Sequence, residues 1–427
     1  MTEKKGNSIE FDRSRCIKCT KCVLRCKNLG ISHLTVEGEG KDRRIEFRQE
    51  NPCVRCGQCT LVCPAFSMRE QTDLEKVKKM LDTGNKYLIV QCAPSVRASI
   101  GEIFKMEHDP SIEKKLNTAL RILGFSKIFD VNFGADITSL VEAEELLERL
   151  KDGGVLPMFT SCCPSWVSFV RNYEPQLLAN LTTAFSPHIH SGFAYRTWWA
   201  EKESLDPANM VIISIMPCTA KKDEIREFNG LRAVDCVLTV RELARLIIER
   251  GIDFANLEET EGDSLSHYSG GAVIYGKSGG VMESALRVIK KKVDNAVFEN
   301  LVTEEAKTGT GESFRKAEIN IGPETVKVAV ISEPRNFRNF IRSGEYKNYH
   351  YVEIMNCSGG CIGGGGQPLL PTRPALEIEL MQKRRDILQR IGSEKQKRNA
   401  LENANATEYV DWVETKDLKH SLLVSPV

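Results

Sequence analysis

Eight cysteines near the N-terminus fall into two runs with the same spacing. They are Cys16, Cys19, Cys22 and Cys26 in the first run, and Cys53, Cys56, Cys59 and Cys63 in the second. Both runs follow C-x2-C-x2-C-x3-C, and Pro64 follows the second. Thiolates at this spacing hold iron–sulfur clusters, and the fourth cysteine of each run serves the other cluster. The pattern therefore predicts two 4Fe–4S clusters and a chain that carries electrons.

Seven cysteines remain, and five of them lie in three segments that each follow an apolar run. These segments are residues 160–166 with Cys162 and Cys163, residues 216–222 with Cys218, and residues 353–361 with Cys357 and Cys361. Ligands of open α/β sheets bind beyond the carboxyl ends of the strands. Three strand ends that carry thiols can therefore meet at one buried centre. Iron–sulfur clusters commonly use four thiolates, and these segments supply five.

The residues around these cysteines suit a crowded cofactor. Gly363–Gly366 let the backbone approach closely, and Met216 and Met355 supply soft, adaptable packing. A single cysteine after a strand is usually a small buried apolar residue, and we interpret Cys92 and Cys236 in that way.

Alternating strands and helices must position these segments. Buried strands are predicted at Tyr87–Val90, Ile128–Val131, Leu156–Phe159, Met210–Ile215, Cys236–Val240, Val326–Ile331 and Tyr349–Met355. Helical patterns lie at Thr72–Leu81, Ile137–Leu150, Val240–Arg250 and Leu376–Arg390. The alternation predicts an α/β body with mainly parallel sheets and helices on their faces.

The domain organisation follows from these changes in sequence pattern along the chain. We expect an α+β, ferredoxin-like module with two 4Fe–4S clusters over residues 1–80. A two-lobed α/β catalytic body is expected over residues 81–372, and a helical tail, packed on the outside and partly mobile, over residues 373–427.

Composition excludes several classes of function. The net charge of +1 predicts neither nucleic-acid binding nor attraction to a membrane surface, and the chain shows no apolar stretch long enough to span a bilayer. The first residues lack the apolar segment of a secretory signal. Cysteines that serve as metal ligands must stay reduced, so we expect a cytoplasmic protein.

The three later cysteine segments resemble the signature motifs of the iron-only (diiron) hydrogenases. The motifs stand here as TSCCPSW, MPCTAKKDE and EIMNCSGGCIGGGGQP, with supporting stretches at residues 93–97 and 278–283. The resemblance implies an H-cluster, in which a 4Fe–4S cubane is joined to a diiron unit with carbonyl, cyanide and azadithiolate ligands. It implies that the cubane is held by Cys163, Cys218, Cys357 and Cys361, with Cys361 as the bridge to the diiron unit.

The resemblance also assigns the surroundings of the diiron unit. Lys221 would donate a hydrogen bond to a cyanide, and Met216, Met355, Pro94 and Ser95 would line the site. Where better-known members carry a glutamine after Ser-Pro, this chain has His188, with His190 close behind. We expect one of these histidines to contact the distal side of the site and to alter its hydrogen bonding.

Cys162 is the thiol left over, and the resemblance makes it the proton donor beside the diiron unit. The implied proton route continues through Glu142, Thr182, Glu145 and Arg149. Glu142, Glu145 and Arg149 are spaced i, i+3 and i+7, which places them on one face of a helix. The alternative for such a charged trio is a solvated helix face.

One motif is set aside. Residues 271–278 satisfy G-x4-G-K-[ST], the formula of a phosphate-binding loop. The middle of the segment is bulky and apolar, and a phosphate cradle needs exposed backbone amides between small residues, so we do not expect nucleotide binding here.

The sequence favours reversible reduction of protons to dihydrogen, with electrons from a ferredoxin or a similar carrier and with maturation enzymes that install the diiron unit. Three alternatives stay open. They are a hydrogen-sensing regulatory protein, an iron–sulfur assembly protein of the same fold, and a hydrogenase subunit of a larger electron-sharing complex. Retention of Cys162 argues against the sensor, and the full set of three motifs argues against the assembly protein.

Overall fold

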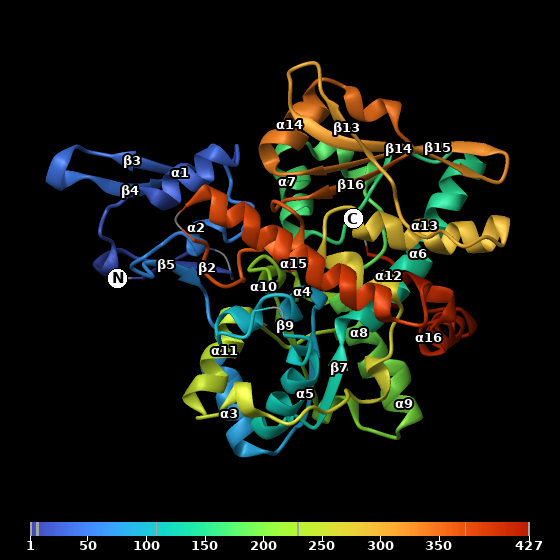
Figure 1. Cartoon of the computed structure of the whole chain (residues 1–427), viewed down its shortest axis with the longest axis horizontal. Coiled ribbons are helices and arrows are strands. Elements are labelled where there is room, and N and C mark those ends of the chain that lie inside the picture. The colour runs from blue at the N-terminus through green and yellow to red at the C-terminus, as the bar shows by residue number, and fades with distance from the viewer. Residues whose placement is uncertain (1, 6–7, 108, 229, 372, 426–427) are drawn as a thin grey trace.

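A computed structural model describes residues 2–5, 8–107, 109–228, 230–371 and 373–425. The expected domain limits at residues 1, 372 and 427 lie outside this part of the chain. In Figure 1 the N-terminal module projects from one side of a body that contains two sheets, and a long helix, α15, crosses the middle of the body.

The N-terminal module contains two small antiparallel sheets. Strands β1 (Thr2–Lys5), β2 (Ile9–Asp12) and β5 (Met68–Glu70) form one, and β3 (Leu34–Glu37) pairs with β4 (Arg44–Phe47) in the other. Helices α1 (Lys21–Asn28) and α2 (Gln58–Leu61) each begin inside a cysteine run. Equivalent residues of both runs have positive φ, at Lys18 and Thr20 and at Arg55 and Gly57, so both loops curl in the same way.

The first sheet of the body is entirely parallel, with strand order β12-β9-β6-β7. Its strands are β6 (Tyr87–Cys92), β7 (Lys127–Asp130), β9 (Met210–Met216) and β12 (Cys236–Thr239). All four predicted strands are therefore confirmed. Two end one residue early because Asp130 and Thr239 cap the helices that follow: the Asp130 side chain accepts from the Asn132 N–H, and Thr239 forms a capping box with Glu242.

The second sheet is mixed, but across the two sheets of the body most strand pairs are parallel, so the prediction of mainly parallel sheets is confirmed. Its order is β13-β14-β15-β16-β8, in which β15, β16 and β8 are parallel while β13 and β14 pair antiparallel. The strands are β8 (Met158–Phe159), β13 (Glu304–Lys307), β14 (Ser313–Ile321), β15 (Glu324–Ser332) and β16 (Tyr351–Met355). Strands β13 and β14 escaped prediction because most of their residues are polar and solvent-facing.

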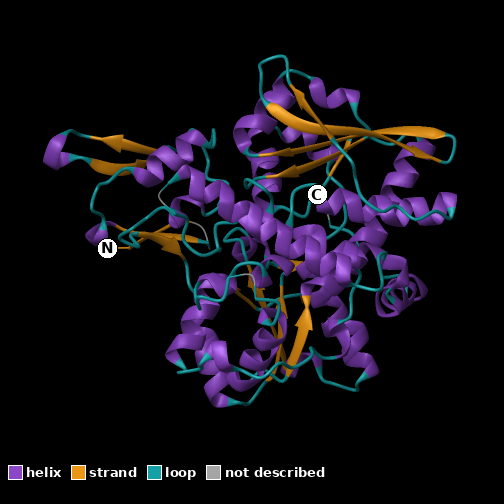
Figure 2. Cartoon of the chain, viewed as in Figure 1, coloured by secondary structure: helices purple, strands orange, loops and turns teal. Residues whose placement is uncertain are grey.

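Helices cover both sheets, as Figure 2 shows. They are α3 (Leu74–Thr83), α4 (Pro94–Arg97), α5 (Ile112–Leu123), α6 (Val131–Asp152), α7 (Pro164–Tyr173), α8 (Pro187–Ala194), α9 (Ala200–Lys202), α10 (Lys221–Glu224), α11 (Val240–Glu249), α12 (Gly270–Val273), α13 (Gly280–Asp294) and α14 (Pro334–Arg342). Helix α6 starts six residues before its predicted beginning, and residues 131–143 are all buried. The first half of α6 therefore passes through the core.

The tail is helical as predicted, in α15 (Pro374–Glu394), α16 (Ala404–Thr415) and α17 (Lys419–Leu422). It is embedded more deeply than a layer packed on the outside. Arg384, Leu388 and Tyr409 are fully buried. The Arg384 guanidinium donates to both carboxylate oxygens of Glu102, at 2.6 and 2.7 Å, and to the carbonyl of Ile362 at 2.7 Å, so the tail braces the loop that carries Cys361.

Residues 271–278 do not form a phosphate loop. They run through α12 and a 3-10 helix at Ile274–Gly276, and a 3-10 helix at Ser264–Ser266 precedes them. A Cβ on Gly276 would overlap Leu388 of the tail, which leaves no room for a phosphate. Over the described residues, each helix is too short or too polar to cross a lipid bilayer.

Candidate active site

Three strand ends bring the later cysteines together from two different sheets. Strand β9 of the parallel sheet leads to Cys218, whereas β8 and β16 of the mixed sheet lead to Cys163 and Cys357. Cys163 stands directly before α7, and Cys361 opens a 3-10 helix at Cys361–Gly363. The candidate site therefore lies where the carboxyl ends of the two sheets face each other.

Electrostatics shows that these four thiols are neighbours. Burial, and then the proximity of Cys163, raises the pKa of Cys218 to about 12. Burial raises the pKa of Cys357 as well, and three neighbouring thiols raise it further: Cys218, Cys56 and Cys163. Burial also raises the pKa of Cys361, and the nearby Cys163 and Cys218 raise it further. Four thiolates together would repel one another in a medium that already disfavours charge.

The spacing of these donors does not suit a single metal ion. Among the described residues, no three histidine, cysteine or carboxylate side chains are grouped closely enough to ligate one ion. Thiols that are neighbours without converging on one ion fit a polynuclear cluster, whose several iron atoms each bind a different cysteine.

Glycines in the third motif allow backbone segments to touch. A Cβ on Gly364 would overlap the carbonyl of Pro217, and one on Gly365 would overlap the carbonyl of Cys56. Gly360 has φ +93° and lies against the backbone of Ser278, whose N–H donates to the Gly359 carbonyl at 2.9 Å. The loop of Cys361 is thus fixed from three sides by main chain.

The second cysteine run reaches this loop directly. The amide of Gln58, between Cys56 and Cys59, donates to the Gly363 carbonyl at 2.7 Å and lies 3.4 Å from the Cys357 sulfur. Cys56 is one of the groups that raise the pKa of Cys357. A cluster held by the second run would therefore be adjacent to a cluster held by Cys357.

The N-terminal cysteines interact in the interleaved pattern expected of two clusters. After burial, Cys63, Cys16 and Cys19 contribute to the raised pKa of Cys22, which is about 12. Cys26 contributes to the raised pKa of Cys53 and of Cys56. The fourth cysteine of each run thus lies among the first three of the other run.

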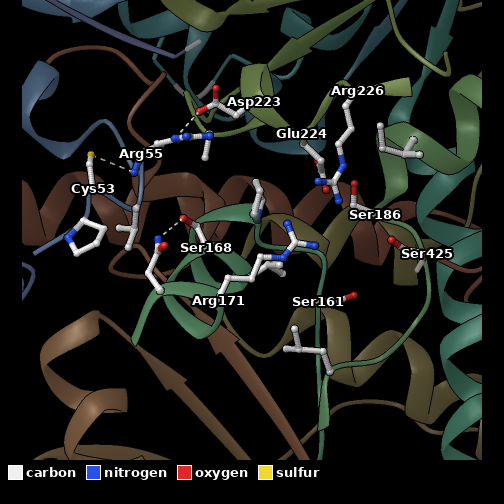
Figure 3. Close-up of a pocket in the computed structure, with 18 of the residues that line it drawn as sticks. Cys53, Arg55, Ser161, Ser168, Arg171, Ser186, Asp223, Glu224, Arg226 and Ser425 are labelled. Carbon is white, nitrogen blue, oxygen red and sulfur yellow. Dashed lines mark hydrogen bonds and ion pairs between the residues drawn. The ribbon is translucent and has the colours of Figure 1, made fainter. Parts of the chain in front are cut away.

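A cavity of about 660 Å³ separates part of the module from the body. In Figure 3 the Arg55 guanidinium extends from the second cysteine run, beside Cys53, to Asp223 of α10. The Arg55 Nε–Asp223 Oδ2 distance is 3.2 Å, and Ser8 Oγ donates to the same carboxylate at 2.7 Å. These contacts fix the module against the helix that carries Lys221.

The residues assigned to the diiron pocket lie at the same strand ends. Met216 ends β9, Met355 ends β16, and Pro94 and Ser95 open α4 after β6. Gln367 joins two of these segments because its amide donates to the carbonyls of Ser95 and Cys361. The Ser95 hydroxyl is fully buried and has no protein partner in the described chain, which leaves it available to a bound group.

Lys221 is held by two acceptors. Its ammonium donates to Glu224 Oε2 at 2.6 Å and to the Cys162 carbonyl at 3.0 Å. Burial alone would lower the pKa of Lys221, but Glu224 raises it above its ordinary value. Burial likewise favours a neutral Glu224, but Lys221 and His188 hold its pKa at about 2. The pair is therefore fully ionised at neutral pH.

His188 contacts this ion pair through Glu224. Its Nε2 is 2.6 Å from Glu224 Oε2, and its Nδ1 is 3.3 Å from Ser214 Oγ. Burial lowers the pKa of His188, and the positive charge of Lys221 lowers it further. A neutral ring beside an ionised carboxylate carries its proton on Nε2, so Ser214 donates to Nδ1 while accepting from Gln91 at 2.8 Å. Both ring nitrogens of His188 therefore have partners. We infer that His188 acts on the site indirectly, through Glu224 and Lys221.

His190 has a different setting from His188. Its two ring nitrogens contact Thr138 Oγ1 at 2.8 Å and the Leu423 carbonyl at 2.9 Å. It therefore ties α8 to α6 and to the C-terminal residues.

The outer half of the implied proton route is continuous. Arg149 donates to Glu145 Oε1 at 2.6 Å, and Glu145 Oε2 accepts from Thr182 Oγ1 at 2.6 Å and from the Thr183 N–H at 2.9 Å. Glu145 also lines a cavity of about 390 Å³ between α6 and the tail. The trio is therefore not a solvated helix face, since Glu145 and Arg149 are largely buried and mutually bonded.

In the inner half, no direct hydrogen bond of ordinary geometry joins the side chains of Glu142 and Cys162 within the described part of the chain. Glu142 is 1% exposed, and neither carboxylate oxygen has a hydrogen-bond partner of ordinary geometry among the described residues. Burial raises the pKa of Glu142 to about 8, although the Tyr351 hydroxyl opposes the rise. Burial, followed by the charge of Glu142, raises the pKa of the Cys162 thiol. A carboxyl group of this pKa can both accept and release a proton near neutral pH.

Several contacts of the site were not predicted from the sequence. Glu224 had a usable signal, since it lies three residues after Lys221 within the second motif, the spacing of a helical ion pair. Gln58, Ser214 and Gln91 had none, because their contacts join distant segments. Cys92 and Cys236 are buried in the apolar core, as predicted.

Comparison with known proteins gives two family matches. The family described as "Iron only hydrogenase large subunit, C-terminal domain" matches residues 86–365, and "4Fe-4S dicluster domain" matches residues 15–67.

Similar individual proteins cover most of the chain. It is 39% identical over 417 residues to Iron hydrogenase 1 of Clostridium pasteurianum, covering 94% of this chain and 72% of that protein. It is 35% identical to the NADP-reducing hydrogenase subunit HndD of Solidesulfovibrio fructosivorans, covering 93% and 70%. Similarity to cytosolic iron-sulfur assembly component 3 of Pongo abelii is lower, at 27% identity over 85% of this chain and 83% of that protein.

A similar solved structure is that of a variant of the apo [FeFe]-hydrogenase HydA1 from Chlamydomonas reinhardtii. Its TM-score is 0.71 and its sequence identity 31%, covering 82% of this chain and 98% of that chain.

Proposed function

The chain belongs to the iron-only hydrogenase family and carries a two-cluster ferredoxin-like N-terminal module, and we propose that it catalyses the reversible reduction of protons to dihydrogen. The observation that supports this most is the meeting of four thiols from three motifs, with a fifth thiol beside them.

The four thiols fit an iron–sulfur cubane. Burial and mutual repulsion raise the pKa of Cys218, Cys357 and Cys361, so these thiols favour the neutral form without a bound metal. Iron removes both penalties because it is cationic and binds thiolates. We assign Cys163, Cys218, Cys357 and Cys361 as ligands, with Cys361 as the bridge to the diiron unit. When bound, the H-cluster supplies the redox chemistry that converts protons and electrons to dihydrogen.

Electrons are proposed to arrive through the module. One accessory cluster is assigned to Cys16, Cys19, Cys22 and Cys63, and the other to Cys53, Cys56, Cys59 and Cys26, on the basis of the interleaved thiol interactions. The second cluster would then lie next to the active site, since Gln58 spans from its loop to Gly363 and Cys357. A ferredoxin-type carrier would deliver electrons to the first cluster.

Protons are proposed to pass along α6. Arg149, Glu145 and Thr182 form the hydrogen-bonded outer portion. Glu142 and Cys162 form the buried inner portion, where water must bridge the unpaired carboxyl because a buried polar group without a partner is costly. Cys162 would hand the proton to the site.

Lys221 is proposed to stabilise an anionic ligand of the diiron unit by donating its third N–H. Glu224 and the Cys162 carbonyl take its other two donors and so fix the direction of the ammonium. Met216, Met355, Pro94 and Ser95 would exclude water from the pocket. The same proposal includes a cytoplasmic location, dependence on maturation enzymes, and the domain limits 1–80, 81–372 and 373–427.

Two other functions have a specific observation in their favour. The match to an NADP-reducing hydrogenase subunit favours a role within a larger electron-sharing complex. The lower similarity to an iron–sulfur assembly component favours that role less, because the chain retains all three cysteine motifs and Cys162.

The test is the variant Cys162→Ala, compared with the matched variant Cys236→Ala. Cys236 is a buried core cysteine outside the site. We expect both variants to retain the spectroscopic signals of all clusters, and only Cys162→Ala to lose at least about 99% of dye-driven hydrogen evolution. Wild-type turnover by Cys162→Ala would show that the relay assignment is wrong. Absence of turnover by the fully matured wild type would refute the hydrogenase proposal.

A further inference from the structure

One face of the N-terminal module combines an exposed cluster cysteine with unneutralised positive charge. Residues 13–28 contain six lysines and arginines and no acidic residue. Arg13 pairs with Glu46, and Arg25 pairs with Glu377. The remaining four cations are exposed and have no ion pair within the described chain: Arg15, Lys18, Lys21 and Lys27.

Exposed apolar side chains lie on the same part of the module. Ile17 is 64% exposed, Leu24 54% and Phe66 46%. Ile17 and Ala65, the neighbour of Phe66, line one small hollow together with Cys16, Cys19 and Cys63. Leu24 lies three residues from both Lys21 and Lys27 on α1, so these three side chains share one helix face.

Cys19 itself is solvent-exposed, unlike Cys22 and Cys63. The sulfur that is nearest to solvent therefore lies within the basic and apolar surface. Figure 1 shows that the module projects from the body, so a partner can approach this side without meeting the two large sheets.

We infer that residues Arg15, Ile17, Lys18, Lys21, Leu24, Lys27 and Phe66, around Cys19, form the docking face for a small protein electron carrier with an acidic surface. The inference rests on the proposed function and deepens it by locating the partner's site. The cations steer an acidic carrier toward the exposed cysteine, and the apolar side chains hold it for the time of electron transfer. Such a face suits a transient complex of small area.

This assignment separates two kinetic roles. Charges on a rim change the association rate and its dependence on salt, whereas buried apolar contacts change the dissociation rate. Lys21 and Lys27 should therefore control the association rate, and Leu24 the lifetime of the complex.

The experiment uses the full chain with its accessory clusters but without the diiron unit, so that it does not depend on hydrogen chemistry. A reduced, acidic ferredoxin is mixed with the protein, and reduction of the accessory clusters is followed by stopped flow at several salt concentrations. The double variant Lys21→Glu/Lys27→Glu is compared with Lys79→Glu/Lys151→Glu, which changes the net charge equally at two exposed lysines, on α3 and α6, outside the proposed face. Reduced methyl viologen, a small radical cation, is the second electron donor.

We expect the face variant to slow reduction by ferredoxin at low salt by about tenfold or more and to lose most of the salt dependence. Reduction by methyl viologen should stay within about twofold of wild type, which shows intact clusters. Leu24→Ser should shorten the lifetime of the complex and leave the salt dependence unchanged. Equal slowing by the two double variants, or equal slowing with both donors, would overturn the docking assignment. Failure of hydrogen evolution by separately matured protein, together with normal ferredoxin kinetics, would count against the proposed function alone.

Discussion

Glu142 offers a test in which stability and activity must move in opposite directions. Burial gives this carboxyl a pKa of about 8 in the folded protein, compared with 4.5 for an ordinary glutamate. Between these two values the folded state keeps a proton that the unfolded state has released. The free energy of unfolding therefore falls as pH rises from about 4.5 to 8, by about 5 kcal/mol in total.

The substitution Glu142→Gln keeps the shape of the side chain and replaces the ionisable carboxyl group by an amide that does not titrate. The free energy of unfolding should then fall less steeply with pH than in wild type, by about 1.4 kcal/mol per pH unit between pH 5 and 8. At pH 7 the variant no longer carries a penalty of about 3 kcal/mol. Hydrogen evolution should drop by about 10²- to 10⁴-fold, because a positioned acid–base group contributes that much to proton transfer.

The measurements are anaerobic denaturant titrations across this pH range and dye-driven hydrogen evolution by the matured protein. Glu144→Gln is the control, since Glu144 lies on the same helix, is about half exposed and pairs with Lys292. It should change neither the pH slope nor the turnover substantially. A Glu142→Gln protein with wild-type turnover would refute the relay, and an unchanged pH slope would refute the raised pKa.

Three further substitutions test the supports of the site. Gly365→Ala should destabilise the protein by about 1–3 kcal/mol in thermal unfolding, because its methyl group would overlap the Cys56 carbonyl; full stability would contradict that contact. Arg384→Met should cost about 3–5 kcal/mol because it leaves the Glu102 carboxylate without its partner, whereas the exposed neighbour Arg385→Met should cost little. His188→Ala should shift the cyanide stretching bands of the matured protein and His188→Gln should shift them less, because glutamine can still donate; identical spectra would show that His188 does not act on Lys221.

The body's parallel strands were predictable because they are buried on both faces and form continuous apolar runs, as in Met210–Met216. Strands β13 and β14 were not, since most of their residues are polar. The start of α6 was also missed, because Asn132 and Asp136 are polar residues that tertiary packing buries. Local pattern therefore located the elements that carry an apolar signal and failed where long-range contacts decide.

The same division holds for the site. Cysteine spacing placed the thiol segments at strand ends, and the structure brings these segments together. The spacing of Glu142, Glu145 and Arg149 put them on one helix face, but the bond between Glu145 and Thr182 joins residues 37 positions apart. The pairing of His188 with Glu224 likewise depends on how α8 packs against α10. Such contacts have no local signature.

The central claim is that one buried cubane, held by Cys163, Cys218, Cys357 and Cys361, carries a diiron unit. Infrared spectroscopy of the anaerobically matured protein tests it most directly. We expect carbonyl and cyanide stretching bands that are present in the wild type and lost in Cys361→Ser, while the accessory-cluster signals persist in both. Matured wild-type protein with intact accessory clusters but without these bands would contradict it.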